Sequence, residues 1–166
     1  SYALPMDRLR AECYGRQWGA VMLWLPCLKN QKDILTNPLT TRDMLSRVMQ
    51  ADMLVWPLFC NAEEVRKTWT FRREFGIGDS GVVFVPYWEN RRFTTTRDGV
   101  VAGYYQNGKQ SLVLVSNLNR HPETVQLTVG EGRVTNAETG QAIPVAGGKV
   151  TLDLRRNDYA GLRIDD

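Results

Sequence analysis

The sequence predicts an α/β segment over residues 1–81, followed by an all-β antiparallel sandwich over residues 82–166. Two continuous apolar runs in the first part alternate with segments of helical spacing, a pattern typical of parallel strands connected by helices. After Val82 the apolar period shortens to two residues and turn signals become frequent, which is typical of antiparallel strands. We therefore expect two structural parts, with the stretch from Val82 to Gly99 as the crossover between them.

The overall composition is that of an ordinary folded protein. The chain has 166 residues, of which 43% are hydrophobic and 23% are charged. Its net charge of +3 is too small to indicate a nucleic-acid-binding surface by itself. No apolar run approaches the roughly 20 residues that a membrane helix needs. We therefore expect neither nucleic acid nor a membrane as a partner.

The first helix and the first strand are indicated by their ends and by their apolar content. Pro5 suits the first position of a helix, and Gly15 suits a C-terminal stop. The run from Trp18 to Pro26 is continuously apolar, as expected for a strand buried on both faces of a parallel sheet. The segment therefore begins as a helix followed by a buried strand.

A second helix, a second strand and a third helix follow. Thr40 is expected to cap the second helix, with Asp43 favouring its positive end. The apolar run over residues 52–59 predicts the second buried strand. Asn61 and Glu64 form a pair that resembles a capping box at the start of the third helix. That helix is expected to end at a cluster of glycines: Gly76, Gly78 and Gly81.

The second part reads as six to eight short antiparallel strands. Asn107 and Gly108 predict a type I′ hairpin turn, because such a turn needs positive φ at both central positions. Alternating apolar residues mark further strands over residues 124–130 and within residues 147–164, and a second hairpin is expected over residues 132–145. Tyr87 and Trp88 are expected to pack at the seam between the two parts.

The predicted first part is physically incomplete. Two parallel strands alone leave unpaired backbone groups on their outer edges and do not make a stable sheet. The α/β segment therefore needs strands from a second copy of the chain or from a preceding part of a longer protein. A (β/α)₈ barrel repeats the strand–helix unit eight times, and its last two units match residues 18–75.

Several stretches carry a resemblance to a known family: "YGRQWGAVMLWLP", "TRDMLSRVMQADMLVWPLFCN" and "FGIGDSGVVFVPYWEN". They resemble the end of the barrel in bacterial glycoside-hydrolase-like proteins. "GYYQNGKQSLVLVSNLN", "TNAETGQAIPV" and "LDLRRNDYAGLRI" are similar to the C-terminal β-sandwich of those proteins. The resemblance implies the C-terminal portion of a carbohydrate-active protein. Catalysis there uses two carboxylates on barrel strands, and neither can be matched to a residue of this chain.

Candidate site residues follow the two predicted strands, because active sites of such barrels lie at the C-terminal ends of strands. These ends carry Trp24, Lys29 and Asn30 after the first strand and Trp56 after the second. The indole planes of Trp24 and Trp56 can stack on sugar rings, which predicts a carbohydrate-lining role through the parent protein. The opposing interpretation is that both tryptophans belong to the core.

No metal or cofactor is expected. The three cysteines are widely spaced, no CxxC motif is present, and there is a single histidine, whereas a structural zinc site needs about four nitrogen or sulfur ligands. The Gly-rich loop around Asp79 does not match a phosphate-binding loop, so a turn is expected there. The arginine-rich stretch over residues 91–97 is expected to be a solvated loop, with binding of an anionic sugar or phosphate as the alternative.

Two other functions stay open at this point. The first is a carbohydrate-binding or adhesive sandwich without catalysis, which needs an exposed aromatic platform; the candidates are Tyr104, Tyr105 and Tyr159. The second is a small thiol enzyme that uses Cys60 with His121, because a cysteine nucleophile needs a base to form thiolate.

Overall fold

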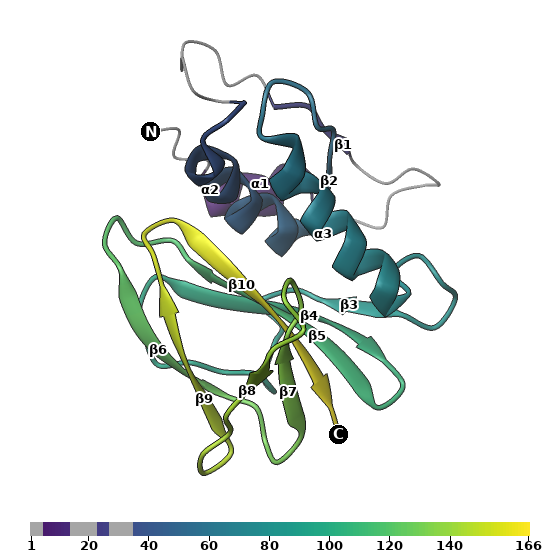
Figure 1. The fold of residues 1–166 in the computed structure, drawn as a ribbon, viewed down its shortest axis with the longest axis vertical. Coiled ribbons are helices and arrows are strands. Elements are labelled where there is room, and N and C mark those ends of the chain that lie inside the picture. The colour runs from purple at the N-terminus through teal and green to yellow at the C-terminus, as the bar shows by residue number, and fades with distance from the viewer. Residues whose placement is uncertain (1–4, 14–22, 27–34) are drawn as a thin grey trace.

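The computed structural model describes residues 5–13, 23–26 and 35–166. The described part has a helical layer that lies over one face of a six-stranded sheet, while a two-stranded sheet covers the other face (Figure 1). The helical layer contains α1 (Met6–Cys13), α2 (Pro38–Val48), η1 (Met49–Ala51) and α3 (Ala62–Phe75), with the short strands β1 (Leu23–Trp24) and β2 (Leu54–Val55).

The predicted parallel strands are adjacent, and they are short. β1 pairs with β2 in parallel, with Leu23 opposite Leu54 and Trp24 opposite Val55. The prediction that the first strand is buried on both faces is wrong for its described residues, because the side chains of Leu23 and Leu25 are exposed. None of the described elements covers these two side chains, and this leaves the pair without the two-sided burial of a parallel sheet.

The start of α2 differs from the prediction. Asn37, and not Thr40, is the N-cap, and its side chain accepts a hydrogen bond of 2.9 Å from the backbone N–H of Leu39. Pro38 occupies the first helical turn, where its fixed φ suits the helix and its missing N–H costs nothing. The Asn-Pro pair thus starts the helix three residues earlier than a Thr40 cap would.

The predicted ends of α3 are confirmed. The Asn61 side chain accepts hydrogen bonds from the backbone N–H groups of Glu63 and Glu64. Gly76 is the C-cap in a left-handed conformation, with φ of 86°, and this conformation favours glycine. The capping box is only half formed, because the Glu64 carboxylate bonds to Arg42 and Lys67.

The second part is antiparallel, as predicted. The six-stranded sheet has the order β3 (Val83–Val85), β4 (Val100–Asn107), β5 (Gln110–Asn117), β10 (Asp158–Asp165), β7 (Arg133–Asn136) and β8 (Ala142–Ile143). β6 (Glu123–Thr128) pairs with β9 (Lys149–Leu154) in the second sheet. Alternate residues of β6 and β9 are buried, and they pack in one core with residues of the large sheet.

The central strands are buried on both faces. Along β5, Leu112 and Leu114 belong to the core shared with the helices, whereas Val113 and Val115 belong to the core shared with β6 and β9. Tyr105 and Tyr159 also belong to the core under the helices. Side chains that precede and side chains that follow the predicted boundary at residues 81–82 therefore share one core. A division into two domains at that point stays a prediction.

The first hairpin turn is placed one residue later than predicted. Asn107 pairs with Gln110, so Gly108 and Lys109 form the two-residue loop. Among the residues of this loop only Gly108 has a positive φ, at 56°. Positive φ at the first central position alone is the property of a type II′ turn, so the type I′ prediction is wrong.

Candidate functional site

Two of the predicted carbohydrate-lining residues, Trp24 and Trp56, lie at the C-terminal ends of β1 and β2. The backbone N–H of Trp56 donates to the carbonyl of Trp24 at 2.9 Å, which places the two tryptophans on neighbouring strands. Trp24 is partly buried and packs against the core under the helices, whereas Trp56 is 53% exposed. Lys29 and Asn30 lie outside the described residues. Their predicted role in lining a sugar site remains a prediction.

Further apolar side chains are exposed next to Trp56. Leu58 and Phe59 follow it directly, and Phe59 is 56% exposed. Phe59 also has a positive φ of 56°, a conformation that costs free energy for a residue with a side chain. We name the exposed apolar set Leu25, Trp56, Leu58 and Phe59 the strand-end rim. Large exposed apolar patches mark surfaces that contact another molecule.

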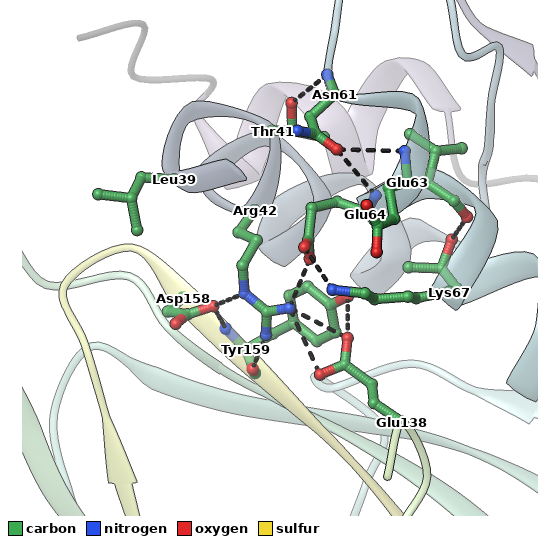
Figure 2. A network of polar contacts seen from close by, with 12 residues as sticks. Leu39, Thr41, Arg42, Asn61, Glu63, Glu64, Lys67, Glu138, Asp158 and Tyr159 are labelled. Carbon is green, nitrogen blue, oxygen red and sulfur yellow. Dashed lines mark hydrogen bonds and ion pairs between the residues drawn. The ribbon is translucent and has the colours of Figure 1, made fainter. Parts of the chain in front are cut away.

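A buried polar cluster lies between the helices and the large sheet, and Arg42 is at its centre (Figure 2). From α2, the Arg42 side chain donates to the Asp158 carboxylate on β10 at 2.6 Å and to Glu64 on α3 at 2.9 Å. It also donates to Glu138, in the turn between β7 and β8, at 3.0 Å. The guanidinium lies 4.3 Å from the ring centroid of Tyr159. One side chain on α2 therefore bonds to three other elements: β10, α3 and the turn between β7 and β8.

The cluster is balanced in charge and its groups are well paired. Lys67 donates to Glu64 at 2.6 Å, Arg155 donates to Asp158 at 2.9 Å, and the Tyr159 hydroxyl donates to Glu138 at 2.8 Å. The three cations Arg42, Lys67 and Arg155 thus face the three carboxylates of Glu64, Glu138 and Asp158. A buried charge is tolerated only when it is paired and hydrogen-bonded, and this condition is met here.

The pairing sets the protonation of the cluster. Burial alone would raise the pKa of Glu64, but the hydrogen bonds from Lys67 and Arg42 outweigh it and lower the pKa. Burial would likewise lower the pKa of Arg42, but the surrounding Tyr159, Glu138 and Asp158 raise it. Burial raises the pKa of the Tyr159 hydroxyl well above its ordinary value, so the phenol stays neutral. None of these groups is shifted toward neutral pH, and this arrangement suits a structural joint better than acid–base catalysis.

No motif in the sequence indicates this cluster. Arg42 and Asp158 are separated by 116 positions, and neither lies in a recognisable motif. A polar residue next to the apolar stripe of a helix is ordinarily solvated, so only the packing of α2 on β10 reveals its burial.

The alternative thiol site is not assembled in the structure. Cys60 is buried among the apolar residues under the helices, and burial raises the pKa of its thiol. His121 lies in the turn after β5, with its ring 3.2 Å from the Glu123 carboxylate. A buried thiol with a raised pKa holds little thiolate, which is the reactive form.

The aromatic platform of the binding-module alternative is also missing. Tyr105 and Tyr159 are buried, and Tyr104 packs edge-on against Phe93 with ring centroids 5.0 Å apart. All the large apolar side chains that are exposed in the described chain lie between Leu23 and Val83. The β-sandwich therefore presents no exposed aromatic face in residues 84–166.

Residues of the other predicted loops form contacts with residues of the same chain. Arg92 forms an ion pair with Asp166, and Arg97 lies 3.1 Å from Glu123. The backbone N–H of Asp79 donates to the carbonyl of Gly76 at 3.0 Å, as expected in a turn. Trp88 lies under the Arg10 guanidinium of α1, 4.7 Å from the ring centroid, which supports its predicted place at the seam.

The described part of the chain also lacks metal-binding clusters and membrane-spanning helices. Residues 5–13, 23–26 and 35–166 contain no group of three or more histidine, cysteine or acidic side chains that could hold a metal ion. Among the same residues, no helix is both long enough and apolar enough to cross a membrane.

Comparison with known proteins gives a fold. No family model matches the sequence. No curated protein matches it. Among solved structures, the chain is similar to a GH27 β-L-arabinopyranosidase from Geobacillus stearothermophilus, with a TM-score of 0.55 and 10% identity. The fold is glycoside-hydrolase-like. The match covers 78% of this chain and 31% of the arabinopyranosidase, so this chain corresponds to less than a third of that enzyme.

Two further glycan-related structures resemble the chain more distantly. A GH30 endoxylanase from Clostridium papyrosolvens C71 has a TM-score of 0.48 and 11% identity over 81% of this chain and 39% of that chain. AmyP in complex with maltotriose has a TM-score of 0.46 and 16% identity over 63% of this chain and 20% of that chain. Likenesses with TM-scores under 0.5 are too weak to interpret.

Proposed function

We propose that this chain is the C-terminal portion of a bacterial glycoside-hydrolase-like protein. Its α/β segment supplies the last strand–helix units of a (β/α)₈ barrel, and its β-sandwich supports that barrel. One observation carries the proposal: in the described part of the chain β1 and β2 form a two-stranded parallel sheet, while apolar side chains at their ends are exposed. The glycoside-hydrolase-like fold, matched over 78% of the chain, supports the same interpretation.

The joint between the two parts supports a scaffolding role for the sandwich. Arg42 on α2 pairs with Glu138 and Asp158 in the sandwich and also with Glu64 on α3, which in turn pairs with Lys67 on the same helix. Buried ion pairs of this kind favour one relative arrangement of the packed elements, because any other leaves charges unpaired. The sandwich thereby holds the helices, and through them β1 and β2, in a fixed position.

In this proposal the strand-end rim faces the carbohydrate-binding side of the assembled barrel. Trp24, Trp56, Lys29 and Asn30 line the path of a glycan there, and the catalytic carboxylates come from other strands. The partner is the preceding part of the same protein or a second copy of this chain. The 166 residues alone bring about no turnover.

The test is an activity screen of the purified 166-residue chain against aryl glycosides of several sugars. We expect no release of the aryl group above the rate of the buffer. Clear hydrolysis that copurifies with the chain would exclude the proposal. A second readout is sedimentation velocity over a range of concentrations. Exposed apolar strand ends predict self-association that Trp56→Lys with Phe59→Lys reduces, whereas a fully monomeric parent chain would count against an unfilled barrel edge.

A further inference from the structure

A second candidate site lies at the opposite end of β2 from the strand-end rim. An open cavity of about 660 Å³ lies between the C-terminal half of α3, the loop over residues 77–82, and strands β3 and β4. Its volume is within the range of small-molecule binding sites, which is about 300–1,000 Å³. Asp52 and Leu54 line it from the start of β2, whereas Trp56, which follows this two-residue strand, is not part of its lining.

One wall of the cavity carries a fixed carboxylate. Asp52 has a left-handed backbone with φ of 55°, and its side chain is 44% exposed. Its Oδ1 accepts a hydrogen bond from the Tyr105 hydroxyl and pairs with the Arg72 guanidinium at 3.1 Å. Its Oδ2 bonds to none of the residues that the structure describes. The carboxylate is therefore held by one oxygen and offers the other as an acceptor.

The same wall contains an unmet donor. The Arg72 side chain is only 6% exposed, and it lines the cavity. Its Nη2 pairs with Asp52 and its Nη1 reaches the Met53 carbonyl at 3.4 Å, while its buried Nε has no partner in the described structure. A buried N–H without a partner is costly and uncommon in folded proteins. Its presence beside a cavity indicates a wall that lacks one polar partner.

The remaining walls are apolar and aromatic. Trp69 on α3 lines the cavity and is 39% exposed, and Phe84 on β3 lies in ring contact with Tyr105 at 4.8 Å. Further apolar side chains complete this surface: Leu54, Ile77 and Val82. The cavity thus opposes an aromatic and aliphatic surface to a carboxylate–guanidinium pair.

The charges around the cavity balance. Asp52 and Asp79 contribute two negative charges, and Arg72 and Arg73 contribute two positive charges. A balanced rim does not favour an anion or a cation. It favours a neutral ligand that has hydroxyl groups for Asp52 and Arg73 on one side and C–H groups for Trp69 on the other. A sugar ring has both properties.

We propose that this cavity is a second binding site, for one unit of a neutral saccharide, with Asp52 and Arg73 as hydrogen-bonding residues and Trp69 as the stacking surface. The site is non-catalytic, and its lining does not include the residues of the strand-end rim. It does not depend on the proposed barrel, because all of its walls belong to the present chain.

The test is a titration of the ¹⁵N-labelled 166-residue chain with arabinose, xylose, galactose and maltotriose, followed through the tryptophan indole N–H signals. Trp69→Leu identifies the Trp69 signal by its loss. We expect at least one neutral sugar to shift the Trp69 signal in a saturable manner. Loss of one stacking contact should weaken binding by about tenfold in Trp69→Leu.

Three further measurements keep the result decisive. Arg66→Ala, at an exposed position of α3 outside the cavity lining, should leave the affinity unchanged, and Trp56→Leu serves only to identify the Trp56 signal by its loss. Arg73→Ala, an exposed position on α3, should weaken binding even if Trp69→Leu fails to fold. Glucuronate and glucosamine should bind no better than their neutral counterparts. The proposal is overturned if no neutral sugar shifts the Trp69 indole signal, or if the sugar shifts the Trp56 signal and not the Trp69 signal. It is also overturned if a charged sugar binds more tightly than its neutral counterpart. The titration reads sugar binding and not aryl glycoside hydrolysis. Failure of this proposal can therefore be distinguished from failure of the proposed function.

Discussion

The Nε of Arg42 on α2 donates a hydrogen bond of 2.6 Å to the Asp158 carboxylate on β10, across the boundary between the helices and the sheet. Asp158 in turn accepts from the backbone N–H of Tyr159 at 2.8 Å, and the Arg42 Nη2 donates to the Tyr159 carbonyl at 2.9 Å. The start of β10 is therefore held to α2 by both side-chain and backbone contacts. Replacement of Arg42 tests how much the joint contributes.

Arg42→Met should destabilise the protein strongly. The substitution keeps most of the aliphatic stem but leaves Asp158, Glu138 and Glu64 buried without their shared cation. Breaking a buried ion pair from one side costs about 3–5 kcal/mol, so the free energy of unfolding should fall by that order in a urea titration. Arg66→Met on the exposed face of α3 is the matched control, with an expected change within about 0.5 kcal/mol. Equal effects at the two positions would contradict the structural role of Arg42.

The stability should fall at acid pH because of Glu64. Its pKa is lower in the folded protein than the ordinary 4.5, owing to the hydrogen bonds from Lys67 and Arg42 that outweigh burial. The unfolded chain therefore takes up the proton first as the pH falls. The contribution is complete above about 4.5 and is lost as the pH falls through the folded pKa. Urea midpoints measured from neutral to acid pH should show a smaller acid loss in Glu64→Gln than in the parent, and an unchanged acid slope would contradict this origin.

Two glycines with positive φ should respond differently to alanine. Gly108 has φ of 56° and open space where a Cβ would lie, so Gly108→Ala should cost only the backbone strain, about 1 kcal/mol. Gly99 has φ of 71°, and a Cβ there would overlap the Asn119 side chain. Gly99→Ala should therefore lower the unfolding midpoint by more than Gly108→Ala. A reversed order in thermal unfolding would show that Asn119 moves aside at no cost.

Cys60 should be unreactive in the native protein. It is buried, and burial raises the pKa of its thiol, so little thiolate forms near neutral pH. Iodoacetamide labelling followed by peptide mass spectrometry should modify Cys60 only in urea, at concentrations that unfold the chain. Cys13, which is partly exposed, provides an internal comparison. Rapid native labelling of Cys60 would revive the thiol-enzyme alternative.

Local patterns predicted much of the secondary structure. Period-two alternation located β6 and β9, and the Asn61 cap and the Gly76 stop bounded α3. The predictions were wrong at the start of α2 and at the first hairpin turn. Asn37 with Pro38 took the cap of α2 from Thr40, and the hairpin loop moved from Asn107–Gly108 to Gly108–Lys109. In both cases neighbouring residues satisfied the same backbone requirement.

The candidate sites were predictable to different degrees. The strand-end tryptophans followed from the two apolar runs, because parallel strands place their C-terminal ends side by side. The walls of the sugar cavity did not, because Asp52, Trp69 and Phe84 come from three elements that share no motif. The exposed Phe59 depended on a left-handed backbone, for which a non-glycine residue gives no reliable sequence signal.

The sequence by itself determined the order of elements: helix and parallel strand first, antiparallel strands after, because side-chain periodicity and cap residues act over a few neighbouring positions. Only the tertiary structure decided that the helices and the sandwich share a core, that Arg42 is buried among three carboxylates, and that a neutral cavity forms beside Asp52. These features depend on contacts between residues far apart in the chain, whose free energies appear only when the elements pack together.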